Sequence, residues 1–306
     1  MTLAPIALFA YNRPIHLARS IAALAANKEA SLCDLTIFCD GPKDGQAKNV
    51  AATHVVARNA SGFASINVVA RPINLGLAAS VSSGVTAILE RHESVIVFED
   101  DILASPHCLN YVNRALEHYH DDRRIASIGC YVFPVDPPLK RTFFLRVTDC
   151  FGWATWRDRW ASYSPDAAYL ADEIDRRGLG RRFDLEGRYP YMRMLRDCAA
   201  NRNSSWAVRW YASQFLQERV CLYPGPTMTE NIGMDGTGIH SGTTDAYNTV
   251  LAAEPAGEFP DDVREDAGAF EATAEFLATL LSENARLGVR IRNRLRGFYR
   301  KVFANA

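Results

Sequence analysis

The sequence has almost no excess of charge, no long hydrophobic run and no paired cysteine motif. Its 306 residues carry 34 Lys and Arg against 35 Asp and Glu, so the formal net charge is −1. A dedicated nucleic-acid binder is usually basic, and we therefore expect no nucleic-acid partner. No apolar run approaches the ~18–20 residues that a membrane-spanning helix needs. The first residues also lack the basic segment of a signal peptide, so we expect a cytoplasmic protein.

The cysteines are odd in number, scattered, and without a CxxC pair, which argues against a zinc site or a disulfide framework. Most of them lie in apolar stretches, as reduced and buried thiols do in a reducing compartment. The seven are Cys33, Cys39, Cys108, Cys130, Cys150, Cys198 and Cys221. Hydrophobic content of 48% and charged content of 23% are ordinary for a folded protein, and the length allows one large α/β domain or two smaller ones.

Three consecutive acids, Glu99-Asp100-Asp101, directly follow an apolar run at 95–98. Such a run predicts a buried strand of a mostly parallel sheet. Ligands of open α/β sheets bind beyond the carboxyl ends of the strands, so these acids should stand at the mouth of a cleft. Neighbouring carboxylates repel one another unless a cation or hydrogen-bond donors compensate them. Hard divalent cations take carboxylate oxygens and keep positions open for phosphates, and the acids therefore predict a metal or ligand site.

Helix capping is the alternative interpretation of these acids, because Asp favours the N-cap and the first turn of a helix. Ser105-Pro106 provides a better start for the next helix, which we expect over 107–120. Asp100 and Asp101 come too early to cap that helix, which favours the ligand site.

Strands and helices alternate in the residues before the acids. Apolar runs predict strands at 5–10, 35–39, 66–70 and 95–98, with helices near 15–26 and 46–59 and a third that opens at 74–80 and ends near 91. This order implies a right-handed, mostly parallel doubly wound sheet, which is an α/β fold. Asn12 and Arg13 follow the first strand and Asp40 follows the second, so they should meet the acids at one edge, where a nucleotide would lie. Asp40 also fits ordinary turn chemistry.

Common nucleotide-binding motifs are missing from these turns. The segment Asn74-Leu75-Gly76 is not part of a P-loop, because no Gly-Lys-Ser/Thr follows it. The turn after the first strand lacks the GxGxxG of a nicotinamide-binding domain. A nucleotidyltransferase normally carries a Gly-rich basic loop there, and the sequence Ala-Tyr-Asn-Arg-Pro at 10–14 has no glycine.

Tryptophans and glycines mark the second half of the chain. Trp153, Trp156 and Trp160 are spaced i, i+3 and i+7, which predicts one face of a helix. Core packing suits two of them, whereas Trp153, next to Gly152, is expected at a pocket wall. Further strands are predicted at 125–129, 143–147 and 220–223, and a helix at 206–217 that carries Trp206. A Gly-rich segment over 231–242 predicts a mobile functional loop.

The ordered set of these features resembles the nucleotide-sugar-dependent glycosyltransferases with the GT-A fold. The chain is similar to bacterial family 2-type enzymes and, more closely, to the N-acetylglucosaminyltransferase I group, over about 5–245. The motifs that carry the resemblance are Arg13, Asp40, Glu99-Asp100-Asp101, Thr148-Asp149 with Gly152-Trp153, and Gly238-Ile239-His240-Ser241-Gly242.

The resemblance implies an inverting transfer of a hexosyl or N-acetylhexosaminyl group from a UDP-sugar. Asp101 would bind Mn²⁺ or Mg²⁺ at the diphosphate, with His240 as a second ligand or a phosphate contact. Glu99 and Asp100 would contact the sugar and the ribose, Asp40 the uracil, and Arg13 the phosphates. Tyr11 and Asn74 would complete the nucleotide-sugar site, and Trp153 and Trp206 would form a sugar or acceptor pocket.

The general base is where the chain departs from the family. The related enzymes carry an Asp pair between tryptophans on a helix, whereas 206–210 reads Trp-Ala-Val-Arg-Trp, with no carboxylate. A single displacement needs a base for the acceptor hydroxyl, and we expect Asp149 or Asp235 in that role. A non-catalytic nucleotide-sugar-binding protein of the same fold is the alternative.

We expect a GT-A domain over 1–245, with a nucleotide-binding half at about 1–104 and an acceptor half at about 105–245. A helical C-terminal extension should follow over 246–306. The expected function is a metal-dependent transfer from a UDP-sugar to a glycan or lipid-linked acceptor in bacterial surface polysaccharide assembly. The enzyme would be cytoplasmic, with peripheral attachment at the inner face of the plasma membrane.

The basic tail at 284–303 supports this location. Six Arg and one Lys lie between residues 286 and 301, with no acid among them. They surround an apolar stripe of helical spacing, formed by Leu287, Ile291, Leu295, Phe298 and Val302. A terminal helix docked on the core with a solvated basic face is one interpretation. A helix lying in the headgroup region of an anionic membrane is the other.

The membrane hypothesis predicts binding to anionic vesicles but not to neutral vesicles. Each Arg near an anionic surface contributes on the order of 1 kcal/mol, and salt screens the attraction. Sedimentation with vesicles should therefore show binding that weakens as salt is raised and that is lost on truncation before Asn284. A truncated protein that binds anionic vesicles as well as the full chain would show that the tail is structural.

Overall fold

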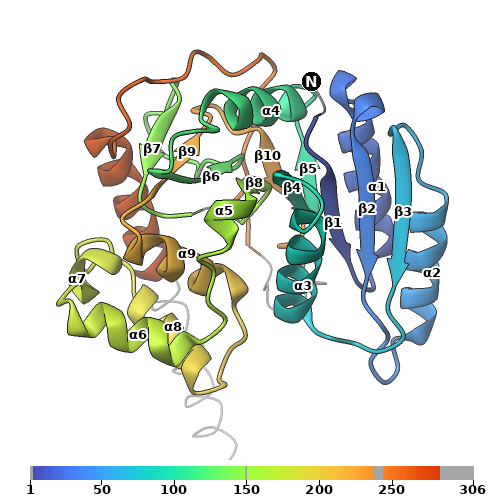
Figure 1. Ribbon diagram of the computed structural model, residues 1–306, viewed down its shortest axis with the longest axis horizontal. Coiled ribbons are helices and arrows are strands. Elements are labelled where there is room, and N and C mark those ends of the chain that lie inside the picture. Colours follow the sequence, from blue (N-terminus) through green and yellow to red (C-terminus); the bar gives the residue numbers. More distant parts are fainter. Residues whose placement is uncertain (1–2, 149, 237–243, 283–306) are drawn as a thin grey trace, which may run out of the picture.

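The computed structural model describes residues 3–148, 150–236 and 244–282 (Figure 1). Asp149, His240 and the basic tail at 284–303 lie outside these ranges, and the expectations for them stay predictions. No helix in the described part of the chain is long and apolar enough to cross a membrane.

An eight-stranded mixed sheet forms the centre of the molecule, with the strand order β3-β2-β1-β4-β8-β6-β9-β7. The strands β1, β2, β3 and β4 are mutually parallel neighbours, and β6 pairs in parallel with β9, whereas β8 and β7 run antiparallel to their partners. The strands are β1 (Ile6–Ala10), β2 (Asp34–Cys39), β3 (Ser65–Ala70), β4 (Ser94–Glu99), β6 (Ile125–Gly129), β7 (Phe143–Leu145), β8 (Trp153–Trp156) and β9 (Val220–Tyr223).

The helices cover both faces of the sheet and build a separate group beside β7 and β9 (Figure 1). They are α1 (Pro14–Ala25), η1 (Lys28–Leu32), α2 (Ala47–Arg58), α3 (Leu77–Leu89), α4 (Cys108–His118), α5 (Arg157–Trp160), α6 (Ala167–Arg176), α7 (Gly180–Phe183), α8 (Tyr191–Ala199) and α9 (Trp206–Leu216). A further helix occupies 267–282.

Alternate residues of the central strands pack on opposite faces. Along β4, Ile96 and Phe98 belong to the apolar cluster that includes α1, α2 and α4. Val95 and Val97 belong instead to the cluster with α3 and the tryptophans of α9. Both faces of β4 are therefore buried, which explains why this strand is a continuous apolar run.

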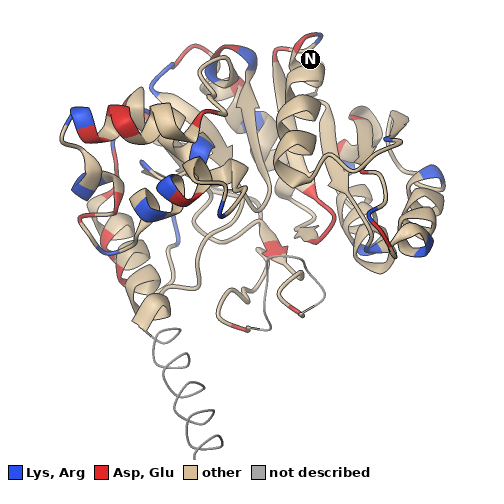
Figure 2. Ribbon diagram, turned by 90° about the horizontal axis from the view of Figure 1, so that it is seen from below, with Lys and Arg blue, Asp and Glu red and all other residues tan. Residues whose placement is uncertain are grey.

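A third apolar cluster joins the helices α6 to α9 to β7, β9 and the helix at 267–282. Phe270 and Leu277 of that last helix are buried in it. The structure thus confirms the predicted α/β fold class, with a mostly parallel sheet, flanking helices and a helical C-terminal extension. None of the seven cysteines forms a disulfide. Figure 2 shows Lys and Arg interspersed with Asp and Glu over the described helices.

The helix predicted over 153–160 is wrong in its first half. Trp153–Trp156 forms strand β8, and α5 begins only at Arg157. The strand lies between β4 and β6, and Trp153 is opposite both Val97 and Gly129. Aromatic and β-branched residues suit a pleated surface with a neighbour on each side, and this pairing outweighed the helical spacing of the tryptophans.

A short two-stranded sheet extends the edge where β4 ends. It consists of β5 (Ile102–Ala104) and β10 (Thr229–Asn231), which run antiparallel, with Asn231 opposite Ile102. The backbone N–H of Ile232 continues the pairing by donating to the Asp101 carbonyl over 2.9 Å. This sheet brings a segment more than 120 residues away along the chain next to the three acids.

Gly41 lies where the loop after β2 crosses the loop after β3. A Cβ atom at this position would lie 2.5 Å from the Ile73 carbonyl oxygen and 2.7 Å from its Cα atom. Real Cβ atoms do not approach backbone atoms so closely, so any side chain would force the two loops apart.

Gly41→Ala should therefore lower the free energy of unfolding by about 1–3 kcal/mol, the usual cost of overpacking. Denaturant unfolding measures this change. The matched control is Gly257→Ala, because a Cβ atom there meets nothing within 4 Å. The control should change stability by less than about 0.5 kcal/mol, as surface substitutions usually do. Equal losses in the two variants would contradict the close approach.

Candidate functional site

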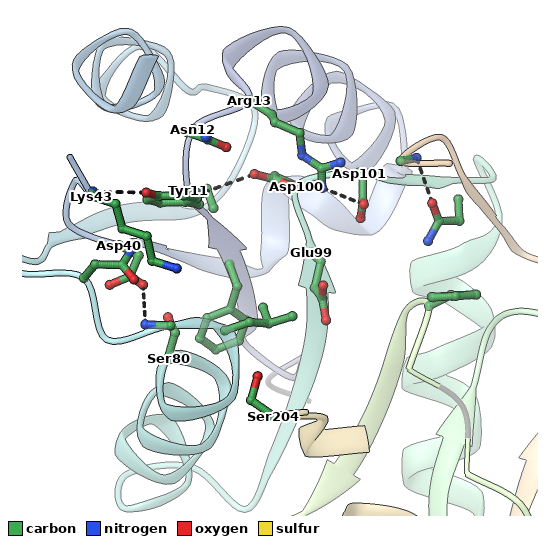
Figure 3. A pocket seen from close by; sticks show the side chains of 18 of the residues that line it. Tyr11, Asn12, Arg13, Asp40, Lys43, Ser80, Glu99, Asp100, Asp101 and Ser204 are labelled. Carbon is green, nitrogen blue, oxygen red and sulfur yellow. Dashed lines mark hydrogen bonds and ion pairs between the residues drawn. The ribbon is translucent and has the colours of Figure 1, made fainter. Parts of the chain in front are cut away.

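A cavity of about 360 Å³ lies at the carboxyl ends of β1, β2 and β4 (Figure 3). These strands are parallel neighbours, so the segments that leave them meet at one edge of the sheet. Four carboxylates and two cations line the cavity: Asp40, Glu99, Asp100, Asp101, Arg13 and Lys43. Tyr11 and Asn74 also line it. The structure therefore brings together every residue predicted for nucleotide-sugar binding.

Arg13 joins the end of β1 to the end of β4. Its Nη2 atom donates to Asp100 Oδ1 over 2.8 Å and to Asp101 Oδ2 over 2.6 Å. Figure 3 shows the guanidinium reaching toward both carboxylates. The local sequence favours this position, because Arg13 is the N-cap residue of α1 and Pro14 then starts the helix.

Asp100 is fixed by several contacts and is only 5% exposed. Its Oδ2 accepts a hydrogen bond from the Tyr11 backbone N–H over 3.1 Å, and its carbonyl accepts one from Ser20 Oγ over 2.8 Å. Asp100 thus connects β4 to the loop after β1 and to α1. These contacts give it a positioning role whatever ligand the cavity takes.

The acids outnumber the nearby cation, and their pKa values show the imbalance. Burial, together with the charges of Asp101 and Asp100, raises the pKa of Glu99 to about 8, although a hydrogen bond from Trp206 opposes the shift. Burial also raises the pKa of Asp100 to about 6, against the opposing effect of Arg13. Burial alone would lower the pKa of Arg13, but the two aspartates raise it above its usual range.

Asp40 holds two loops together. Its Oδ1 accepts hydrogen bonds from the backbone N–H groups of Gly41 over 3.0 Å and Leu75 over 2.9 Å, and its Oδ2 accepts one from Gly76 over 2.9 Å. Asn74 adds a bond from its Nδ2 to the Gly41 carbonyl over 2.8 Å. Asp40 is 4% exposed, so this carboxylate shapes the left wall of the cavity in Figure 3.

The acids suit a hard divalent cation. Asp101 Oδ2 is bonded to Arg13, whereas Oδ1 accepts no hydrogen bond from any described residue. No group of three His, Cys, Asp or Glu side chains among the described residues forms a ready metal cage. A cation at a diphosphate needs only one or two protein carboxylates, because the phosphates and water supply the remaining oxygens. The residues present therefore fit a cation that binds together with a nucleotide.

Residues that the sequence did not single out complete the cavity. They are Phe9, Ala10, Lys43, Leu77, Ser80, Phe151 and Ser204, with Gly76 next to Asn74. Asn12, which the sequence predicts at this edge, and Asn231, Gly233 and Met234 of the predicted Gly-rich loop also line the cavity. Lys43 could have been found, because it follows Asp40 by only three residues in a loop at the predicted edge. Asn231 and Gly233 belong to the segment that the sequence predicted to be a functional loop, but their place beside the acids could not be predicted, since the β5–β10 pairing joins distant segments. A Cβ atom on Gly233 would overlap the Asp101 carboxylate.

The tryptophans lie behind the cavity. Trp153 is fully buried, so its expected place at a pocket wall is corrected. It packs against Trp206 and Trp210, with ring centroids 5.4 and 5.6 Å away, because β8 faces α9 across the sheet surface. Trp206 is 3% exposed and reaches the site only through its hydrogen bond to Glu99.

Asp235 lies on the segment that follows Gly233. Its Oδ2 is 3.1 Å from Nε2 of His16 on α1, and its side chain is 42% exposed. It is therefore near the cavity rim without being among the lining residues. Asp149 and His240, the other predicted catalytic and metal residues, are outside the described residues.

No protein-family model and no curated protein matches the chain. Two solved structures show low similarity. TarS of S. aureus is 11% identical with a TM-score of 0.35, and the match covers 50% of this chain and 28% of TarS. The mannosyltransferase PcManGT from Pyrobaculum calidifontis, solved with GDP-Man and Mn²⁺, is 11% identical with a TM-score of 0.36; the match covers 70% of this chain and 75% of PcManGT.

The raised pKa of Glu99 predicts how stability depends on pH without metal. The folded state keeps the proton up to about pH 8, whereas the unfolded chain releases it near the ordinary glutamate pKa of 4.5. Stability should therefore fall as pH rises through this range, by on the order of 2 kcal/mol or more, since one pKa unit corresponds to about 1.4 kcal/mol.

Denaturant unfolding in the presence of a chelator, from pH 4.5 to 8, measures this loss. Glu99→Gln replaces the carboxyl with a neutral group of similar shape, so its stability should decline much less. Parallel curves for the two proteins would contradict the assignment of the uncompensated charge to Glu99.

Proposed function

We propose that the chain is a glycosyltransferase that moves a sugar from a nucleoside diphosphate sugar to a hydroxyl group of an acceptor. One observation carries this proposal. Three consecutive carboxylates, Glu99, Asp100 and Asp101, line one cavity at the edge of a parallel sheet. Arg13 pairs with Asp100 and Asp101, and a second cation, Lys43, lines the same cavity. Such an edge suits a diphosphate and a divalent cation better than it suits a neutral ligand.

The reaction breaks one bond and forms another at the anomeric carbon of the donor sugar. The bond from that carbon to the diphosphate breaks, and the electron pair leaves with the nucleoside diphosphate. The acceptor oxygen forms the new glycosidic bond on the opposite face, which inverts the configuration. Its proton passes to a carboxylate, for which Asp149 and Asp235 are the candidates. The transition state resembles an oxocarbenium ion, so a nearby carboxylate such as Glu99 stabilises it.

Asp101 would hold Mn²⁺ or Mg²⁺, with His240 as the second protein ligand. The cation would neutralise the charge that develops on the leaving diphosphate. Arg13 and Lys43 are placed to add donors to the phosphates, since both line the same cavity. Asp40, Asn74 and Tyr11 would surround the base and ribose, and UDP is the nucleotide that we propose.

The proposal divides the chain by role. Residues 1–104 would bind the nucleotide, 105–245 would bind the acceptor, and 246–306 would form an extension. The acceptor would be a glycan or a lipid-linked sugar of bacterial surface polysaccharide assembly. The basic tail at 284–303 supports attachment of a cytoplasmic enzyme to the inner face of the membrane, and the vesicle experiment above tests it.

Asp101→Asn should lower metal-dependent turnover of the nucleotide sugar at least about 100-fold, because a metal contact to the leaving group supplies several kcal/mol. Asn keeps an oxygen for Arg13, so thermal unfolding should stay close to that of the parent. Release of UDP or GDP from a panel of nucleotide sugars with Mn²⁺, and with the acceptor mixture of a cell extract, measures the rate.

Asp121→Asn is the matched control, because the Asp121 side chain is fully exposed on the surface. It should leave the rate unchanged. Near-normal turnover of Asp101→Asn at saturating Mn²⁺ would overturn the assignment. Tight nucleotide-sugar binding by the parent without any release of nucleotide would instead favour the non-catalytic binding protein.

A further inference from the structure

A second cavity, of about 240 Å³, lies beside the first and is lined largely by aromatic rings. Phe151 lines both cavities, and the adjacent residues Ser204 and Ser205 line one each. The second cavity and the proposed donor site therefore share part of their lining. Six tyrosines contribute to its lining.

Three of these tyrosines have hydroxyl groups that the protein already uses. Tyr131 donates to the Tyr247 carbonyl over 2.9 Å, Tyr211 to the Phe183 carbonyl over 3.0 Å, and Tyr223 to the Val147 carbonyl over 2.9 Å. These bonds fix the rings, so these tyrosines offer their apolar ring surfaces to the cavity.

The other three tyrosines offer hydroxyl groups as well. No described residue exchanges a hydrogen bond with the hydroxyl of Tyr189, Tyr191 or Tyr247, and all three side chains are half-buried. Burial raises the pKa of Tyr247 to about 12, and Tyr189 and Cys150 contribute to the shift. Burial likewise raises the pKa of Tyr191, with Tyr189 and Tyr247 among the groups that add to it. The three hydroxyls thus lie near one another around the same cavity.

Among the described residues, the lining of this cavity carries no charged side chain. It contains no Lys, Arg, Asp or Glu side chain among those residues. A phosphate or carboxylate inside it would lose its hydration without gaining a counter-ion, which is costly. A wholly apolar ligand would leave the three hydroxyls without partners, and each would lose the hydrogen bonds that water gives it.

We infer that this second cavity binds a neutral sugar ring of the acceptor, with the ring resting on tyrosine faces and its hydroxyl groups bonded to Tyr189, Tyr191 and Tyr247. A pyranose combines the two properties that the cavity requires. Its C–H groups carry partial positive charge and suit the negative face of an aromatic ring. Its hydroxyls both donate and accept, as the tyrosine hydroxyls do. This inference rests on the proposed function, because it specifies the acceptor of that reaction.

The cavity is assembled from segments that are far apart in sequence. Tyr131 follows β6, Tyr189 and Tyr191 lie at the start of α8, Tyr247 precedes the C-terminal helix and Leu277 belongs to that helix. The C-terminal extension therefore contributes directly to the wall of the proposed acceptor site.

The test uses the full-length protein with Mn²⁺ and UDP present. Saturation-transfer NMR titrations with the methyl glycosides of glucose, galactose, mannose, N-acetylglucosamine and N-acetylgalactosamine detect binding down to millimolar affinity. At least one of these neutral glycosides should bind. Methyl glucuronide, in which a carboxylate replaces the hydroxymethyl group of glucose, should bind more than about tenfold more weakly than the best neutral glycoside, because no described residue of the cavity lining supplies a counter-ion.

Tyr191→Phe removes the hydroxyl and keeps the ring, so it should weaken the best glycoside about fivefold to tenfold, as the loss of one hydrogen bond does. Tyr169→Phe is the matched control, because Tyr169 is 58% exposed on α6 and does not line the cavity. The control should leave glycoside affinity unchanged, and both variants should bind UDP with Mn²⁺ as the parent does.

Four results would overturn the inference. They are no binding by any neutral glycoside, equal binding of the glucuronide, an unchanged affinity in Tyr191→Phe, and displacement of the glycoside by phenol at equal concentration. Titration of UDP with Mn²⁺ separates this inference from the proposed function. If UDP and GDP both fail to bind, the proposed function is wrong, and the glycoside titrations still decide whether the second cavity takes a neutral sugar.

Discussion

The ion pairs of Arg13 with Asp100 and Asp101 are the interaction on which the site depends. They tie the loop after β1 to the end of β4 and offset part of the repulsion among three adjacent acids, of which Asp100 and Asp101 are buried. One guanidinium does not balance the charge of three carboxylates. The pKa values of Glu99 and Asp100 are therefore raised, because burial and the neighbouring acids disfavour their charged forms. The edge of the sheet therefore carries more negative charge than Arg13 offsets, which fits the divalent cation that we propose.

The architecture explains how the three neighbouring acids are held in place despite their mutual repulsion. The parallel strands β1, β2 and β4 end at the same edge of the sheet, and the β5–β10 pair lies next to the end of β4. Behind it, Trp206 both packs in the tryptophan cluster and donates a hydrogen bond to Glu99. The same helix, α9, begins beside the tyrosine-lined cavity, because Ser205 lines that cavity and caps the helix. The two cavities thus share part of their wall at the start of α9 and at Phe151.

The sequence predicted the first half of the fold well. A continuous apolar run such as 95–98 must be covered by other elements on both faces, as an inner strand of a sheet is. It placed Arg13, Asp40 and Glu99 to Asp101 at one edge because parallel strands all end there. It misjudged 153–156, whose tryptophan spacing mimics a helix, because the neighbours β4 and β6 that make it a strand are distant in sequence. The tyrosine cavity was not predictable for the same reason, since Tyr131, Tyr191 and Tyr247 come together only through tertiary packing.

The most direct measurement of the central claim is the position of manganese in crystals grown with Mn²⁺ and UDP. Anomalous diffraction locates the ion independently of any assumption about the ligand. We expect one strong anomalous peak bonded to the Asp101 carboxylate, with the diphosphate of UDP beside it and within hydrogen-bond distance of Arg13 or Lys43. A manganese ion bound elsewhere, or UDP bound outside the cavity at the ends of β1, β2 and β4, would contradict the central claim.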